Sequence, residues 1–450
     1  MRKAGVLLHP TSLPQGVLDH HVDRFLDWMT AAGLCVWQML PLGPPHRDHS
    51  PYQSYSSHAL NPALLPADVV YCREDEAAYC RFESQMTCWL EDYAMFVAVR
   101  EQFDDCSWAQ WPQPLRHRDP VALESFCVEH SARLLELKRE QFLLHRLWQQ
   151  LRNKAHRRGI MLLGDIPIGV AYDSADVWAC PQLFKLDDQF RPLVVMGVPP
   201  DYFSKQGQRW GNPHYNWSLM QQYHFTWWRA RIASALRQFD MVRIDHFRGL
   251  QALWEIPAAA ATAVEGQWVE TPGRQLLEAL CEDFPHMPFI AEDLGVITDE
   301  VLALRDLFEL PGLSVLQFGF DGSRGNPHSV DNQVENTVVY TGTHDNDTTC
   351  GWFESLDPEV QENVLQQLPC DAGSMPWPLI AAALQSPAQL AMIPMQDWLA
   401  LDGQHRFNTP GTTEKNWSWR FSWDQVPEQL SATIRDALGR SRRYRCGGET

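Results

Sequence analysis

The sequence predicts a (β/α)8 barrel, and three observations support this fold class. Eight short runs rich in Val, Ile, Leu and Met recur along the chain, as in strands that are buried on both faces of a parallel sheet. Helical patterns lie between many of these runs. Polar residues, most of them acids, close the runs, where barrel enzymes place their chemistry. A doubly wound open sheet shares the local signals, but no GxGxxG motif follows the first run, which favours the barrel.

The eight expected strands are the apolar runs at 4–10, 35–43, 160–169, 241–247, 288–295, 313–320, 337–346 and 390–399. The clearest helical pattern lies between the second and third runs, at 131–159. It has a serine at its start, a 3.6-residue apolar rhythm and a glycine at its end. This alternation of strand and helix is what a (β/α)8 barrel requires.

Uneven spacing between the expected strands predicts insertions. A barrel of about 250 residues gives each strand-helix unit about 30. Here 124 positions separate Met39 from Leu163, 80 separate Asp165 from Asp245, and 47 separate Asp245 from Glu292. All three gaps follow carboxyl ends of strands, so the insertions should crowd the mouth of the barrel. We therefore expect one catalytic domain over 1–450, with insertions after strands 2, 3 and 4 at about 44–158, 170–238 and 250–286.

Composition restricts the classes of partner and cofactor. A net charge of -19 argues against nucleic acids and anionic membrane surfaces as partners and favours a neutral substrate. Eleven cysteines are scattered without a CxxC motif or a Cys/His cluster, and no DxDxDG loop is present, so no metal or other cofactor is expected. The N-terminal apolar run is too short for a signal peptide or a membrane span. The expected location is the cytoplasm.

Acidic side chains close five of the eight expected strands. In chain order these strand-end residues are Asp165, Asp245, Glu292 with Asp293, Asp345 after His344, and Asp397. A single one of them is more often a helix cap or a loop brace than a catalyst. Several at one barrel mouth would repel each other unless cations compensate, and Arg243, Arg248 and His246 stand beside them in the sequence.

Two chemistries use such a cluster of acids. One is a hard metal site for Mg²⁺ or Ca²⁺. The other is glycoside cleavage, in which one carboxyl attacks or activates water and another donates a proton. Nineteen tryptophans, some in polar contexts such as Trp210, Trp417 and Trp419, suit the flat faces of sugars, although core packing accounts for more than half of them.

Nine segments carry a resemblance to a known family. They are LLHPTSLP (7–14), WQMLPLGP (37–44), SPYQS (50–54), GDIPIGVAYDSADVW (164–178), GVPPDYFSKQGQRWGNPHYNW (197–217), RIDHFRG (243–249), AEDLG (291–295), THDN (343–346) and NTPGTTEKNWSWR (408–420). They run almost end to end and in the family's order. The chain resembles the 4-alpha-glucanotransferases of the amylomaltase type (disproportionating enzymes, glycoside hydrolase family 77), which are relatives of the alpha-amylases.

The resemblance implies catalytic roles by matched position. Asp245 resembles the nucleophile, Glu292 the general acid/base, and Asp345 the third carboxylate, which grips and distorts the donor sugar. Arg243 is expected to hold Asp245 ionised, because a paired cation favours the charged form.

The resemblance also implies a set of substrate-binding residues. Segment 197–217 resembles a loop over the substrate groove, whose glycines and prolines we interpret as turns separated by mobile joints. Water exclusion there would favour transfer over hydrolysis. His344 should hydrogen-bond sugar hydroxyls near the scissile bond, and the region of Tyr52 should stack on glucan. The full expected set is Arg243, His246, His344, Tyr52, Asp201, Trp210 and Asn212.

The predicted function is transfer of alpha-1,4-glucan segments from a donor maltodextrin to an acceptor glucan or glucose by a retaining double displacement. The expected partners are maltooligosaccharides and fragments of starch or glycogen. An alpha-1,4-glucan hydrolase with the same carboxylates is the alternative among enzymes. An inactive glucan-binding module is a third possibility, which the presence of all three carboxylates disfavours. The segment after HPTSLP is shorter than in the family, which leaves the contacts of that loop open.

Overall fold

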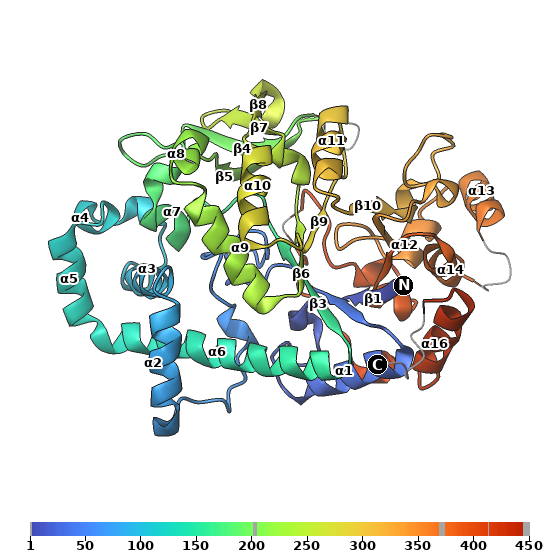
Figure 1. Cartoon of the computed structure of the whole chain (residues 1–450), viewed down its shortest axis with the longest axis horizontal. Coiled ribbons are helices and arrows are strands. Elements are labelled where there is room, and N and C mark those ends of the chain that lie inside the picture. The colour runs from blue at the N-terminus through green and yellow to red at the C-terminus, as the bar shows by residue number, and fades with distance from the viewer. Residues whose placement is uncertain (1, 201–204, 369–373, 413, 444–450) are drawn as a thin grey trace.

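A computed structural model describes residues 2–200, 205–368, 374–412 and 414–443. Eight parallel strands form one sheet (Figure 1). In spatial order they are β10 (Gly312–Val315), β11 (Thr337–Tyr340), β12 (Leu390–Pro394), β1 (Lys3–Leu7), β2 (Val36–Gln38), β3 (Met161–Ile166), β6 (Met241–Ile244) and β9 (Phe289–Ala291). Each expected run overlaps one of these strands.

The two end strands of the sheet, β9 and β10, meet and close the barrel. The backbone N–H of Ala291 donates to the carbonyl of Pro311 at 2.9 Å. Two residues further along both chains, a side chain continues this contact, since Oδ1 of Asp293 accepts from the N–H of Leu313 at 2.7 Å. The predicted (β/α)8 barrel is confirmed.

Both faces of the barrel strands are buried, which explains why the runs are continuously apolar. On β3, Leu163 belongs to the cluster inside the barrel, together with Ile290 of β9. The next residue toward the N-terminus, Leu162, packs instead with Val242 in the large cluster between strands and helices. Successive strand residues therefore serve two different cores.

An outer ring of helices covers the strands. Its main members are α1 (His20–Ala32), α6 (Ser131–Arg157), α9 (Thr226–Gln238), α10 (Gly273–Asp283), α11 (Asp299–Leu307), α14 (Trp377–Gln385) and α16 (Leu430–Arg440). The predicted helix at 131–159 is confirmed as α6. Ser131 is its first helical residue and not its cap, and Gly159, with φ of 70°, lies just beyond its end.

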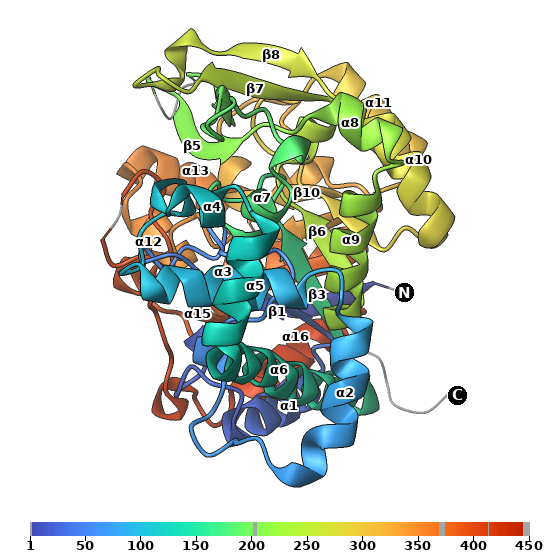
Figure 2. The same ribbon diagram turned by 90° about the vertical axis from the view of Figure 1, so that its left-hand side faces the viewer.

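Four helices precede α6 between β2 and β3 and lie on the left of Figure 1 and toward the viewer in Figure 2. They are α2 (Glu76–Gln85), α3 (Leu90–Gln102), α4 (Gln113–Arg116) and α5 (Pro120–Glu129). From α3, Arg100 donates to the hydroxyl of Tyr55 at 3.0 Å and forms an ion pair with Asp173. These helices thus brace the loop that carries Tyr52.

A second, antiparallel sheet lies at the top of both views, in the order β5-β4-β7-β8. β4 (Val194–Val198) and β5 (Gln208–Pro213) come from the chain between β3 and β6. β7 (Ala252–Pro257) and β8 (Gln267–Glu270) come from the chain between β6 and β9. The two segments join where β4 pairs with β7.

The sheet corrects one expectation about segment 197–217, in which glycines and prolines were interpreted as turns. Gly197 and Pro213 lie in strands β4 and β5. A Cβ at Gly197 would lie 2.1 Å from the carbonyl oxygen of Gln208, so this glycine permits close approach of two strands. Gly207 and Gly211 do have positive φ, of 66° and 85°.

Shorter elements complete the described chain. The α-helices are α7 (Ala175–Ala179), α8 (Trp217–Gln222), α12 (Thr349–Glu354), α13 (Pro358–Gln367) and α15 (Met395–Trp398). The 3-10 turns are Pro10–Ser12, Pro62–Leu64, Arg73–Asp75, Trp108–Gln110, Pro181–Leu183, Phe247–Leu250, Ala263–Glu265, Leu316–Phe318, Val330–Asn332, Gly403–His405 and Trp423–Gln425. Within the described ranges, no helix combines the length and the apolar character needed to cross a membrane.

Candidate active site

The carboxyl ends of β3 and β6 bring three charged residues into contact. The strand register places Asp165 beside Arg243. Nη1 of Arg243 donates to Oδ1 and Oδ2 of Asp165 at 2.8 and 2.7 Å, and to Oδ1 of Asp245 at 2.8 Å. The Asp165 side chain is fully buried, whereas that of Asp245 is 27% exposed. Arg243 is therefore anchored on a buried acid, and Asp245 is the carboxylate that solvent or a ligand can reach.

Glu292 follows β9, the strand next to β6. Ile244 pairs with Ala291, so Asp245 and Glu292 occupy adjacent positions at the ends of neighbouring strands. Both oxygens of Glu292 accept backbone hydrogen bonds, Oε2 from His246 at 2.5 Å and Oε1 from Leu294 at 2.9 Å.

The backbone of His246 explains one of these bonds. His246 has φ of 52° and ψ of 52°, a left-handed conformation that is uncommon for a residue with a side chain. This turn directly follows Asp245, and its N–H donates to Glu292. The strained turn at His246 thus places the N–H whose hydrogen bond to Glu292 links the ends of β6 and β9.

Tyr52 joins this group to the loop after β11. Its hydroxyl donates to Oδ2 of Asp165 at 2.7 Å, which leaves the phenol oxygen to accept from Nε2 of His344 at 2.9 Å. The Tyr52 and His344 rings stack with centroids 5.3 Å apart. Trp417 lies 6.0 Å from both rings and extends this aromatic wall.

Asp345 lies beside His344 and is held by residues from the chain after α15. Its Oδ2 is 3.5 Å from Nε2 of His344, and its Oδ1 accepts from Nδ2 of Asn408 at 2.6 Å. Arg406 donates to the backbone carbonyl of Asp345 at 2.6 Å. The Asp345 side chain is half exposed, so it is open to a ligand.

The second sheet contributes Trp210 and Asn212 from β5. The Trp210 ring meets His246 edge to face, with centroids 4.9 Å apart. Oδ1 of Asn212 accepts from Nε2 of Gln53 at 3.2 Å, next to Tyr52. These contacts attach β5 to the rest of the site. Asp201, which was also expected to bind substrate, lies outside the described residues.

A small pocket, partly open to solvent, adjoins His344 on the side of β1, β11 and β12. Among the residues that the structure describes, three polar atoms of this lining have no hydrogen-bond partner, namely Nδ1 of His9, Oγ of Ser12 and Nε1 of Trp419. Buried polar groups require partners. The pocket can therefore accept water or the hydroxyl groups of a ligand.

Burial dominates the electrostatics of the two adjacent acids. It raises the pKa of Asp245 to about 8, with further increases from the charges of Asp165, Glu292 and Asp345, and Arg243 only partly opposes this. Burial also raises the pKa of Glu292, against the effects of Arg243 and two backbone N–H groups. From the sequence we expected Arg243 to hold Asp245 ionised. Arg243 does lower the pKa of Asp245, but burial raises that pKa by more.

The two histidines of the site are neutral. Burial, with the nearby charges of Arg248 and Arg243, lowers the pKa of His246 to about 3. Burial likewise lowers the pKa of His344, although Asp345 opposes this. Neutral imidazoles can donate to or accept from sugar hydroxyls without bringing additional charge.

Sequence reasoning missed four contributors to the site. Asp165 was recognised as a strand-end acid but was not included among the site residues, and Arg406, Asn408 and Trp417 were not included either. Asn408 and Trp417 belong to the segment NTPGTTEKNWSWR, which was a usable signal. The role of Asp165 depends on its register against Arg243, which the sequence does not show.

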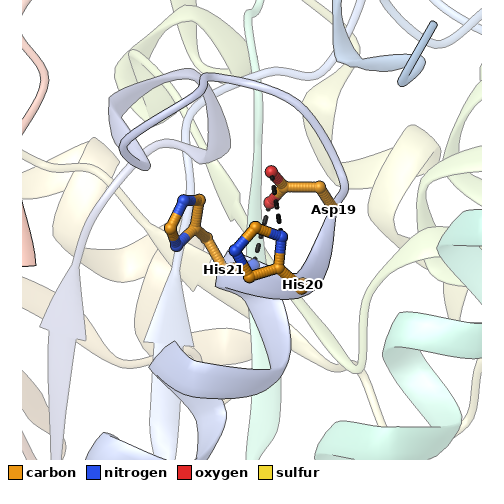
Figure 3. Close-up of side chains that lie close together, drawn as sticks. All are labelled: Asp19, His20 and His21. Carbon is orange, nitrogen blue, oxygen red and sulfur yellow. Dashed lines mark hydrogen bonds and ion pairs between the residues drawn. The ribbon is translucent and has the colours of Figure 1, made fainter. Parts of the chain in front are cut away.

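Among the described residues, Asp19, His20 and His21 form one group whose atoms could together contact a metal ion (Figure 3). Other bonds already occupy two of them. Oδ1 of Asp19 accepts from the N–H of His21 and caps α1, and Nδ1 of His21 accepts from Nε1 of Trp423 at 3.0 Å. A helix N-terminus is also the positive end of its dipole and disfavours a cation. Within this group, Asp19 serves as the N-cap of α1.

Comparison with known proteins identifies the family. A family model of glycoside hydrolase family 77, described as 4-alpha-glucanotransferase, matches residues 7–78 and 70–425. The chain belongs to the 4-alpha-glucanotransferase family. The family member of Thermus thermophilus is 42% identical over 488 residues, which cover 96% of this chain and 97% of that protein. The member of Aquifex aeolicus is 40% identical and covers 98% and 99%.

A solved structure supports the same family. The amylomaltase of Streptococcus agalactiae, solved in complex with acarbose, superposes with a TM-score of 0.94 and 30% identity, covering 99% of this chain and all of that one. The amylomaltase of Corynebacterium glutamicum, at 17% identity and a TM-score of 0.78 over 98% of this chain and 75% of that one, supports the fold.

Proposed function

We propose that this 4-alpha-glucanotransferase moves segments of alpha-1,4-glucan by a retaining double displacement, with Asp245 as nucleophile and Glu292 as general acid and base. The observation that carries the mechanism is the pairing of Ile244 with Ala291, which sets the two acids at the ends of adjacent strands. Neighbouring strands lie about 4.8 Å apart. Retaining enzymes separate their carboxyls by about 5–5.5 Å, and inverting enzymes by about 6.5–9.5 Å.

In the first step Asp245 attacks the anomeric carbon of the donor while Glu292 gives its proton to the glycosidic oxygen. The glycosidic bond breaks, an ester forms between Asp245 and the sugar, and the remainder of the donor leaves as an alcohol. The raised pKa of Glu292 supports this step, because it favours the protonated carboxyl that donates, while Arg243 favours the ionised form of Asp245 that attacks.

In the second step the Glu292 carboxylate removes the proton of the acceptor hydroxyl, whose oxygen attacks the anomeric carbon and releases Asp245. Both steps pass through an oxocarbenium-like transition state. Asp345 and His344 are held in the same loop and are assigned to the donor sugar, where their contacts strengthen as the ring flattens. Arg243 stabilises Asp245 whenever it is released as a carboxylate.

Transfer requires that a sugar hydroxyl compete with water. The contact of Trp210 with His246, and the bond between Asn212 and Gln53, attach β5 over the carboxylates and support water exclusion. A hydrolase with the same carboxylates is not favoured, because the relatives are named 4-alpha-glucanotransferases and amylomaltases. We propose maltooligosaccharides and fragments of starch or glycogen as substrates. The cytoplasmic location remains a prediction.

Maltotriose distinguishes these activities. Incubation of the purified protein with maltotriose should yield glucose together with maltopentaose and longer products, because each transfer lengthens one chain as it shortens another. A hydrolase would yield only products shorter than maltotriose, and that result would overturn the proposal. Asp245→Asn is the matched control and should leave maltotriose intact.

A further inference from the structure

Asp397 is a strand-end carboxylate to which the proposed reaction gives no role. It lies on α15, directly after β12, and is 2% exposed. Its two oxygens accept three hydrogen bonds. Oδ2 accepts from the hydroxyls of Thr341 and Thr349 at 2.5 and 2.7 Å, and Oδ1 accepts from the backbone N–H of Thr349 at 2.7 Å.

These bonds join the two ends of one loop. Thr341 directly follows β11, and Thr349 is the first residue of α12, so a single carboxylate spans the loop 342–348 at its base. Both threonines are fully buried. The loop carries His344 and Asp345 between these two anchor points.

The loop is also braced internally. Oδ1 of Asn346 accepts from the N–H and the hydroxyl of Thr343 at 2.9 and 2.8 Å. The hydroxyl of Thr343 accepts in turn from the N–H of Asp345 at 3.3 Å. A loop with such internal bonds moves as a unit, so a change in the separation of its ends displaces the side chains at its tip.

We infer that Asp397 is a positioning residue that sets the placement of His344 and Asp345 by holding together the ends of the loop 342–348. This inference rests on the proposed function, in which both residues contact the donor sugar. It gives a reason for burying a carboxylate where an apolar side chain would cost less. All the side-chain hydrogen bonds of Asp397 within the described chain go to the loop ends.

The test compares Asp397→Leu with Asp397→Asn. Leucine has a similar size but accepts no hydrogen bond, so the loop ends should separate and kcat/KM for maltotriose should fall about 10- to 100-fold, as expected for a displacement on the order of 1 Å. The amide of Asn can still accept from Thr349, and the threonine hydroxyls can rotate to accept from it. Asp397→Asn should therefore recover most of the activity.

A double-mutant cycle separates positioning from loss of stability. If Asp397 acts through His344 and Asp345, Asp397→Leu should cost several-fold less in an Asp345→Asn background than in the wild type, because the part of its effect that acts through Asp345 is already lost. Rates in that background are measured with alpha-maltosyl fluoride as donor and glucose as acceptor. Asp240→Leu is the matched control. Asp240 accepts from the N–H of Leu162 at 2.8 Å at the amino end of β6, so its loss should lower Tm and leave kcat/KM unchanged.

The inference is overturned if folded Asp397→Leu keeps the wild-type kcat/KM, or if its cost is the same with and without Asp345. If Asp397→Leu does not fold, the double variant Thr341→Val/Thr349→Val replaces it, because it removes both hydroxyl donors to Asp397. Wild-type kcat/KM in this variant, or an equal cost with and without Asp345, would likewise overturn the inference. Failure of the wild-type protein to disproportionate maltotriose would refute the proposed function and the inference together. An active wild type with unaffected Asp397 variants would refute the inference alone.

Discussion

One guanidinium nitrogen of Arg243 lies 2.8 and 2.7 Å from the two carboxylate oxygens of Asp165. The same nitrogen lies 2.8 Å from Asp245, so two acids share one cation. The acid that is fully buried takes two of the three bonds. The remaining attraction does not offset the burial of Asp245, whose pKa rises to about 8. Burial also raises the pKa of Glu292, which favours the protonated form that its proposed role as general acid requires.

Asp245→Asn should abolish transfer while the protein stays folded, because the amide has nearly the same shape but cannot attack. Its Tm should equal or exceed that of the wild type. A raised folded-state pKa means that protonation stabilises the fold, and this contribution is lost as pH rises through about 8. The loss runs from the unfolded-state pKa of about 4 to the folded-state pKa of about 8, so in calorimetric scans the Tm advantage of the variant should grow between about pH 4 and 8 and level off above that. Near-normal transfer by the folded variant would contradict the assignment.

Glu292→Gln should slow natural glucans at least 100-fold, in line with general acid catalysis worth about 10²–10⁴. A maltosyl fluoride donor, whose leaving group needs no proton, should lose much less in the first step. A glycosyl ester on Asp245 should then accumulate, because the base for the second step is gone, and mass spectrometry of the intact protein would detect it. Products from the wild type should keep the alpha configuration. A beta product would refute the retaining mechanism.

The pH profile should report the shared proton. The active form carries one proton on the Asp245 and Glu292 pair, so kcat/KM for maltotriose should fall in alkaline solution as the pair loses this proton, at a pH above the ordinary pKa of a glutamic acid because burial raises both pKa values. It should also fall in acid, when a second proton neutralises the nucleophile. With maltosyl fluoride the alkaline limb should disappear, because the first step no longer needs an acid. Persistence of that limb would assign it to another group.

Tyr52→Phe should lower kcat/KM about 10-fold or more, because Asp165 and His344 lose their shared hydroxyl and buried groups left without a partner cost about 1–3 kcal/mol each. Tyr55→Phe is the control within the same loop. Its hydroxyl accepts from Arg100 and does not contact the carboxylates, so that variant should lose stability without losing rate. Equal effects of the two variants on rate would indicate a general loosening of the loop.

The barrel could be predicted from the sequence because strands such as β3 bury both faces, and double burial produces continuous apolar runs. The three proposed catalytic acids could be named because matched motifs place them at strand ends, which converge in a barrel. The contacts of Asp165 depend on strand register and on Tyr52, which is 113 positions away in the sequence. The elevated pKa of Asp245 depends on how deeply the folded chain buries it. Neither the contacts of Asp165 nor the burial of Asp245 is determined by neighbouring residues in the sequence.

The second sheet could not be predicted for a related reason. β8 is a polar edge strand with little alternation, and β5 contains glycine and proline, so neither resembles a strand locally. The two strand pairs β4–β5 and β7–β8 become one sheet only where β4 pairs with β7, and β6 separates these two strands in the sequence. The uneven strand spacing therefore predicts insertions, but it does not predict that chain from two of the gaps forms one sheet.

The pairing of β4 with β7 has a consequence for recombining this enzyme with its relatives. A chimaera that exchanges only 170–238 would bring in a foreign β4 and set it against the native β7. The native register pairs Val194 with Pro257 and Gly197 with Trp254. A foreign β4 would carry side chains that are not adapted to this register. The same holds for an exchange of 250–286 alone. Residues 170–238 and 250–286 therefore have to be exchanged together. Chimaeras that transfer both stretches should yield folded hybrids far more often than chimaeras that transfer only one.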